Sequence, residues 1–403
     1  MRRLIAFAAL AAAPVFAFTA VPANALAAEA KPAPVCTNDA ATLDAKFPTG
    51  AYETCTASGD KRFTLTIRPE DEPKINCSAW YAFRLTPNRK GRVTVKLDYT
   101  QCGHRYWPKT STDGVNWKYL PEKSVKIEGE KGEQTARITI KLRDKPVFVA
   151  GQEILPPSAY DAWLDQMVIT PHAARRVLGK SAEGRDIPIM TIADATGGQR
   201  ETIVLVGRQH PPEITGALAM FPFVETISGD SDLAKRFRAR FETIVVPILN
   251  PDGVMRGHWR HNTGGVDLNR DWGPFTQPET RLMKGVFDKI ADDPHRQLRL
   301  MIDFHSTQRD IFYTIPDDLP TNPPMFTHDW LARYQERMPD YEVRRNARHE
   351  IGRPISKAYV FDTYGVPGVT FELGDETNRK LIKDIGHESA IAMMETLLAA
   401  DAK

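Results

Sequence analysis

Four short apolar runs in the C-terminal part of the chain predict buried β-strands. They are rich in Val, Ile and Thr, and Gly, Pro, Asn or Asp residues bound them. The runs cover residues 202–207, 243–249, 298–304 and 366–373. Between the first three runs, apolar residues such as Ala217, Leu218, Phe221 and Val224 follow helical spacing. This alternation predicts an α/β fold with a mixed, mostly parallel, doubly wound sheet.

Earlier in the chain, apolar and polar residues alternate with a period of two. The alternation runs from Arg62 to about Val149, with turn signals such as Asp113-Gly114 between the runs. It predicts an all-β sandwich ahead of the α/β part. Aromatic residues of this region are expected in its core rather than on a carbohydrate-binding platform: Trp80, Tyr81, Phe83, Tyr106, Trp107 and Trp117. Composition shifts near residue 165, so we predict a sandwich domain over 29–165 and a second domain over 166–403.

The first 28 residues are typical of a secretory signal peptide. Arg2 and Arg3 precede an alanine-rich apolar stretch, and small-residue cleavage sites follow at Ala23–Ala25 and Ala25–Ala27. The apolar stretch is short for a membrane anchor, and no later segment approaches the ~20 apolar residues of a membrane span. We therefore predict a secreted or periplasmic protein without stable membrane insertion.

Cysteine usage agrees with that expectation. The four cysteines are Cys36, Cys55, Cys77 and Cys102, and an even number in an exported chain indicates two disulfide bonds. Pairing in chain order is the simplest of the three connectivities. No Cys-x-x-Cys pair is present, which disfavours zinc binding by these thiols.

The charge balance disfavours nucleic acid as a partner. Removing Arg2 and Arg3 from the 53 basic residues leaves 51, which equals the number of acidic residues. A nucleic-acid-binding chain normally carries a basic excess. A local group of arginines at positions 344, 345, 348 and 353 is more typical of a solvated loop than of a substrate entrance.

Polar residues with metal-binding chemistry follow the predicted strands. His210 and Glu213 come shortly after the first strand, and His305 ends the third. Ligands of such sheets gather at the carboxyl ends of the strands, so these side chains are expected at one edge. A catalytic zinc ion takes three protein ligands of this kind, two imidazoles and a carboxylate. We predict a site for one Zn²⁺ per chain at His210, Glu213 and His305.

Several motifs in the same order resemble the M14 zinc carboxypeptidase family over roughly residues 172–400. They are His210-Pro-Pro-Glu213, Asn250-Pro-Asp-Gly253, Trp259-Arg260, Gly265-Val-Asp-Leu-Asn-Arg270, Phe304-His305-Ser306 and Thr370-Phe-Glu372-Leu. The resemblance is nearest to the cytosolic-carboxypeptidase-like branch, and it implies a carboxypeptidase-like sheet. It also implies a peptide substrate with a free C-terminal carboxylate.

The resemblance assigns roles that the chemistry supports. Glu372 is expected to be the general base that takes a proton from zinc-activated water. Arg260 is expected to stabilise the oxyanion that forms at the scissile carbonyl. Asn269 and Arg270 are expected to bind the terminal carboxylate, because a guanidinium group offers two parallel donors to two oxygens.

Two positions depart from the pattern of the digestive branch. Its mobile tyrosine has no counterpart in the stretch 349–353, so no catalytic tyrosine is assigned, and Tyr359 and Tyr364 are expected in a wall or core. Lys357 stands about where the floor of the side-chain pocket is expected. A lysine there favours an acidic terminal side chain on the substrate, and a solvent-facing lysine is the equally weighted alternative.

The sequence thus predicts an exported zinc metallocarboxypeptidase. Three alternatives remain: a peptidase or amidase acting on cell-wall peptides, a deacylase of small acylated amino acids, and a non-catalytic module that binds carboxyl-terminated peptides. The presence of Glu372 beside a complete ligand set disfavours the binding module.

Overall fold

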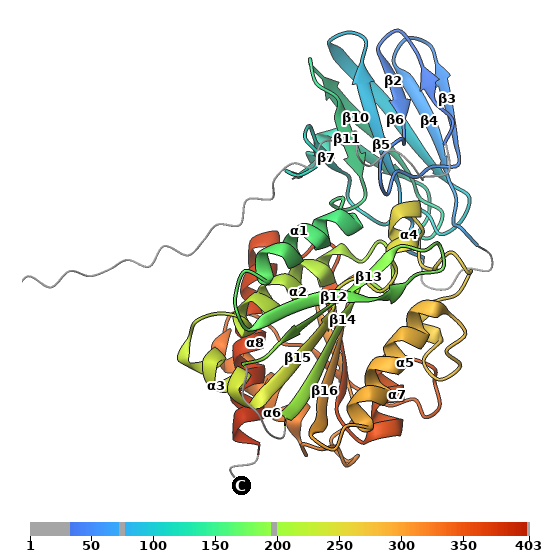
Figure 1. The fold of residues 1–403 in the computed structure, drawn as a ribbon. Helices are drawn as coiled ribbons and strands as arrows, with labels where there is room; N and C mark the ends of the chain where they lie inside the picture. The colour runs from blue at the N-terminus through green and yellow to red at the C-terminus, as the bar shows by residue number, and fades with distance from the viewer. Residues whose placement is uncertain (1–32, 72–76, 195–199, 401–403) are drawn as a thin grey trace, which may run out of the picture.

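Alternating burial along the N-terminal strands places one face of each strand in a shared core. In the computed structural model, which describes residues 33–71, 77–194 and 200–400, two sheets pack against each other across this core (Figure 1). The first sheet has the order β1 (Cys36–Thr37), β2 (Ala41–Asp44), β5 (Ala82–Pro87), β11 (Val147–Ala150), β7 (Lys109–Ser111) and β8 (Lys118–Tyr119). The second has the order β3 (Thr54–Ser58), β4 (Arg62–Ile67), β6 (Gly91–Tyr99), β10 (Thr135–Leu142) and β9 (Val125–Glu128). The predicted all-β sandwich is confirmed.

Four of the six aromatic residues that were expected in the sandwich core are buried, whereas Trp107 and Trp117 are half-buried. Trp80, Tyr81, Phe83 and Tyr106 are buried, and the indole nitrogen of Trp80 donates to the Thr49 carbonyl at 2.8 Å. Two disulfide bonds join Cys36 to Cys55 and Cys77 to Cys102, which is pairing in chain order. The disulfide prediction is therefore confirmed for all four cysteines.

A central eight-stranded sheet organises the rest of the chain. Its order is β12 (Ala173–Lys180), β13 (Asp186–Ile192), β15 (Phe241–Val246), β14 (Arg200–Gly207), β16 (Arg296–Thr307), β19 (Gly368–Gly374), β17 (Ile311–Thr314) and β18 (Arg345–Ala347). The four strands predicted from the sequence, β15, β14, β16 and β19, are adjacent and parallel. Antiparallel pairing at both sides of them makes the sheet mixed, as predicted.

Helices cover both faces of this sheet (Figure 1). Alternate residues of β14 divide between the two layers: Ile203 and Leu205 face one hydrophobic core, and Val204 and Val206 face the other. The first layer contains α1 (Pro157–Met167), α2 (Ile214–Ile227), α3 (Asp232–Arg240), α6 (Phe326–Arg337) and α8 (Arg379–Ala399). The second contains α5 (Pro278–Ala291) and α7 (Ser356–Tyr364). A strand that is buried on both faces consists of a continuous run of apolar residues, and this run allowed the four strands to be predicted from the sequence.

The two parts of the chain meet at residues 154–156. Ile154 packs against the core of the sandwich, whereas Leu155 and the α1 residues Tyr160 and Trp163 belong to the core of the α/β part. Helix α1 therefore packs with the second part, although the predicted boundary at residue 165 assigned it to the first. Ion pairs cross the junction, including Arg379 with Glu153 at 2.8 Å.

Two predictions from the sequence concern a signal peptide and membrane-spanning segments. The predicted signal peptide, residues 1–28, lies outside the described residues. Within the ranges that the structure describes, no helix has both the length and the apolarity needed to cross a membrane.

Candidate active site

The carboxyl ends of three parallel strands bring the candidate site residues together. His210 follows β14, His305 lies in β16 and Glu372 lies in β19. In the register of the sheet, His305 and Glu372 are direct neighbours on adjacent strands. The side chains that the sequence places at the ends of strands therefore lie together at one edge of the sheet.

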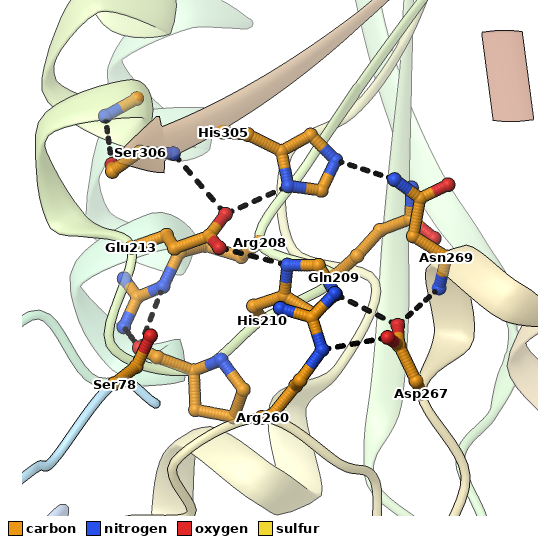
Figure 2. A network of polar contacts seen from close by, with 12 residues as sticks. Ser78, Arg208, Gln209, His210, Glu213, Arg260, Asp267, Asn269, His305 and Ser306 are labelled. Carbon is orange, nitrogen blue, oxygen red and sulfur yellow. Dashed lines mark hydrogen bonds and ion pairs between the residues drawn. The ribbon is translucent and has the colours of Figure 1, made fainter. Parts of the chain in front are cut away.

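Three buried donor groups converge at this edge. Nδ1 of His210 lies 2.8 Å from one oxygen of Glu213, and Nδ1 of His305 lies 2.7 Å from the other (Figure 2). All three ligand atoms lie within 4.8 Å of one another. Two imidazole nitrogens and a carboxylate that meet at one point suit a zinc ion with an open fourth position.

Local backbone features hold Glu213 between the two histidines. Glu213 is the residue before α2, and a Cβ added to Gly216 in the first turn would lie 2.4 Å from the His305 carbonyl oxygen. Only glycine therefore allows α2 to approach β16 this closely. The preceding loop is fixed by Arg208, whose guanidinium donates to the carbonyl of Pro211 at 2.6 Å.

Two further carboxylates orient the histidine rings. Nε2 of His210 lies 2.8 Å from Asp267, and Nε2 of His305 lies 2.8 Å from Asp303. A carboxylate partner on Nε2 fixes the ring and leaves Nδ1 to face a metal. The donor set and its orientation therefore fit zinc. Sequence reasoning missed Asp267 and Asp303, although an acid two residues before Asn269 and before His305 was a usable signal.

Neighbouring charges lower the pKa values of two carboxylates of this cluster, Glu213 and Asp267. Burial would raise the pKa of Glu213, but His210 and His305 outweigh burial and hold the pKa well below its usual range. Burial likewise opposes ionisation of Asp267, and His210, Arg260 and Arg270 reverse the effect, so its pKa is lowered. Anionic Glu213 and Asp267 are the forms that a cation and its histidine ligands require.

Arg260 is joined to the same cluster through Asp267. Its Nε donates to one Asp267 oxygen at 2.6 Å, while the other oxygen lies 2.8 Å from His210 (Figure 2). Arg260 is 5% exposed, so this ion pair is screened little by water. One carboxylate therefore sets the position of both a candidate metal ligand and a candidate oxyanion partner.

Glu372 has a buried carboxylate oxygen without a partner next to the two histidines and Glu213. Its Oε2 has no hydrogen-bond partner within the part of the chain that the structure describes. Burial, reinforced by the charge of Glu213, raises its pKa to about 7. A carboxylate with a raised pKa beside a metal site is suited to accept and return a proton.

The remaining predicted residues line a cavity of about 770 Å³ in front of this cluster. Asn269 turns its oxygen to the Ser356 amide at 2.9 Å, which leaves its NH2 group on the side of the site. Arg270 donates to the Asn269 carbonyl at 2.7 Å. Lys357 is buried, donates to the carbonyls of Thr314 and Arg348, and also lines the cavity, so it is not a solvent-facing lysine.

The N-terminal sandwich forms part of the cavity wall. Its residues at the cavity include both members of the Cys77–Cys102 disulfide and Arg105. Arg105 donates to Asp375, just beyond β19, at 2.9 Å. Arg348 and Arg353 of the predicted arginine group also line the cavity, whereas Arg344 and Arg345 pair with Glu342 and Asp317.

Tyr359 and Tyr364 pack away from the cavity. Their rings contact Trp272 and Phe287, and both tyrosines are half-buried against that hydrophobic core.

Comparison with known proteins identifies the family. The sequence pattern of the zinc carboxypeptidase family M14 matches residues 160–385, and that of the cytosolic carboxypeptidase N-terminal domain matches residues 43–150. The chain belongs to the M14 zinc carboxypeptidase family. The matched segments agree with the two cores of the structure, because the gap between them contains the junction at residues 154–156.

Individual relatives and a solved structure match the chain over different lengths. The chain is 30% identical to mouse cytosolic carboxypeptidase 6 over 139 residues, covering 33% of this chain and 26% of that protein. It is 23% identical to mouse cytosolic carboxypeptidase 3 over 327 residues, covering 73% and 32%. The matches thus span about a quarter to a third of these relatives. A metallo-carboxypeptidase structure from Burkholderia cenocepacia has the same fold, with a TM-score of 0.75 at 19% identity, covering 89% of this chain and 99% of that one.

The predicted secreted or periplasmic localisation is wrong on these findings. The matched N-terminal domain and the relatives are those of cytosolic carboxypeptidases, which point to a cytosolic protein. An alanine-rich apolar start and an even number of cysteines are compositional features, and neither specifies a compartment by itself.

Proposed function

We propose that the protein is a zinc-dependent carboxypeptidase that releases the C-terminal residue of peptides. The convergence of Glu213 with Nδ1 of His210 and of His305, next to an unpartnered Glu372 oxygen, is the observation that carries the proposal. A zinc ion bound by these residues supplies an activated water nucleophile at neutral pH.

Glu372 acts as the proton carrier of this reaction. Its buried carboxylate takes a proton from the attacking water and delivers it to the nitrogen of the leaving amino acid. The unpartnered oxygen is available for this exchange because no protein donor competes for it within the described chain.

Arg260 stabilises the negative charge that develops on the scissile carbonyl oxygen. The ion pair with Asp267 holds the guanidinium through Nε and does not use its two terminal nitrogens. A cation held in place before the reaction stabilises a developing charge without reorganising.

Asn269, Arg270 and Lys357 select the substrate terminus. Asn269 and Arg270 bind the terminal carboxylate, and Lys357 lies deeper at the cavity, where it meets the terminal side chain. Burial lowers the pKa of Lys357 to about 8, with help from Arg348 and Arg353. The group is therefore mostly protonated at neutral pH and favours Glu or Asp at the substrate terminus.

The first prediction concerns the metal. Purified protein is expected to hold about one zinc per chain, and His305→Ala is expected to lose it because two donors hold zinc far more weakly than three. Lys357→Met is the control, because Lys357 contacts neither the three ligands nor Asp267 and Asp303. Elemental analysis after gel filtration measures both, and full zinc retention by His305→Ala would reject the ligand assignment.

The second prediction separates proton transfer from metal binding. Glu372→Gln keeps the shape of the side chain and the zinc but removes the proton acceptor, so kcat is expected to fall roughly 10²- to 10⁴-fold. Steady-state hydrolysis of one peptide, with zinc measured in the same samples, provides the test. A zinc-loaded variant with wild-type kcat would exclude Glu372 as the base.

The third prediction concerns selectivity and its pH dependence. A charge-assisted contact of ~1.5 to 3 kcal/mol predicts a preference of about 10- to 100-fold in kcat/KM for a Glu-ended over a Leu-ended peptide. Lys357 is charged below its pKa, so the preference is expected below about pH 8 and is lost as pH rises through that value.

Lys357→Met is the matched variant for this prediction, because it keeps the length of the side chain without its charge. It is expected to show a small, pH-independent preference ratio. A wild-type ratio that stays flat from pH 6 to pH 10, or a variant ratio equal to that of the wild type, would remove Lys357 from the pocket.

A further inference from the structure

The segment that carries Arg260 contacts the N-terminal sandwich as well as its own domain. This segment, residues 255–261, begins at the end of α4 (Pro251–Arg256), where the Thr49 amide donates to the Met255 carbonyl at 3.2 Å. Gly257 ends α4 with φ of +65°, and a Cβ there would lie 2.7 Å from Ala51 Cβ and 2.8 Å from Thr49 O. Backbone of the catalytic domain and backbone of the sandwich are therefore in close contact at this turn.

Trp259 extends the contact into the sandwich core. Its side chain is 2% exposed and belongs to the same hydrophobic cluster as residues of β4, β6 and β10. Burial of a tryptophan side chain contributes about 150–250 Å² of contact, which makes it an anchor for the adjoining backbone.

A single carboxylate of the sandwich binds the amides on both sides of Arg260. Oε2 of Glu70 accepts from the Trp259 amide at 2.6 Å, and Oε1 accepts from the amides of Arg260 at 2.9 Å and His261 at 2.8 Å. The Glu70 side chain is 7% exposed. Hydrogen bonds from backbone N–H groups to a buried carboxylate are charge-assisted and therefore strong.

The ionisation of Glu70 is consistent with this arrangement. Burial would raise its pKa, but His258 and the amides of His261 and Trp259 outweigh burial and lower it. The neighbouring Asp71 reinforces the contact, because its carboxylate lies 2.7 Å from Nδ1 of His261.

A metal ion is a weaker explanation for this cluster. Glu70, Asp71 and His261 do place three ligand atoms within 4.8 Å of one another. However, both oxygens of Glu70 already accept backbone hydrogen bonds, and the three consecutive amides point at them. The arrangement is that of an anion bound by successive backbone amides.

We propose that Glu70 is a positioning residue that holds the Arg260 guanidinium at the candidate active site. The path is short: Glu70 binds the backbone of Arg260, the Arg260 side chain pairs with Asp267, and Asp267 contacts His210. The N-terminal sandwich thereby takes part in catalysis through the backbone of one loop. This inference rests on the role of Arg260 in the proposed function.

Glu70→Gln is a sharp test because it replaces one carboxylate oxygen by an NH2 group and keeps the number of non-hydrogen atoms. A glutamine offers one acceptor oxygen in place of two, and its NH2 group then faces at least one backbone N–H donor. Whichever way the amide is turned, part of the contact becomes repulsive. Glu153→Gln is the matched control, because Glu153 is also a sandwich-side carboxylate that binds across the junction, to Arg379, through both oxygens.

The first measurement does not depend on activity. Hydrogen exchange followed by mass spectrometry on the full chain should show protected amides at residues 259–261 in the wild type, fast exchange there in Glu70→Gln, and unchanged protection in Glu153→Gln. Equal protection in wild type and Glu70→Gln would overturn the contact itself. The exchange measurement tests the Glu70 contact whether or not the protein hydrolyses peptides. Absence of peptide hydrolysis would reject the proposed function and leave the contact untouched.

The second measurement is a double-mutant cycle on kcat with zinc-loaded protein. Glu70→Gln is expected to lower kcat about 10- to 100-fold with KM nearly unchanged, since a misplacement of about 1 Å can cost ~10²-fold. In the Arg260→Ala background, Glu70→Gln should have no further effect, because there is no guanidinium left to position. Reductions that multiply in the double variant would overturn the proposal.

A variant with a shorter side chain at position 70 is used if Glu70→Gln does not fold. Glu70→Asp keeps the charge and withdraws the carboxylate by one methylene, and the same cycle and exchange measurement apply to it. Loss of kcat without loss of exchange protection at 259–261 would also contradict the positioning role.

Discussion

The ion pair between Asp267 and Arg260 is the constraint on which the candidate site depends. One oxygen of Asp267 accepts a hydrogen bond from Arg260, and the other contacts His210. The candidate metal ligand and the candidate oxyanion partner therefore share one carboxylate. Because all three side chains are buried, breaking either contact would leave a charge without compensation in a region of low dielectric constant. The loop from Arg260 to Arg270 is therefore tied to the loop after β14 by electrostatics rather than by sheet pairing.

The two-part architecture gives this constraint its surroundings. The parallel strands supply His210, His305 and Glu372 at one edge, and the sandwich contributes Arg105 and the Cys77–Cys102 disulfide to the cavity wall. Ion pairs such as Arg105 with Asp375 cross from one part to the other close to the cavity. Contacts between the two parts of the chain thus lie at the wall of the same cavity as the candidate site residues.

The sequence predicted those features that depend on residues close together in the chain, namely the buried strands and the polar residues at their ends. Strands buried on both faces read as apolar runs, and polar residues directly after them marked the sheet edge where His210 and His305 meet. Contacts between distant segments had no such pattern. Glu70 binds an amide 190 residues away, and Trp259 packs in the core of the other part. The compartment was predicted wrongly because composition at the start of the chain outweighed the domain family that the rest of it carries.

The most direct test of the account is the mode of peptide cleavage. Zinc-loaded protein is incubated with one peptide in two forms, with a free and with an amidated C-terminus, and the products are followed by mass spectrometry. Binding of the terminal carboxylate by Asn269 and Arg270 predicts loss of a single C-terminal residue from the free form and no cleavage of the amidated form. Internal fragments, or equal cleavage of both forms, would contradict it.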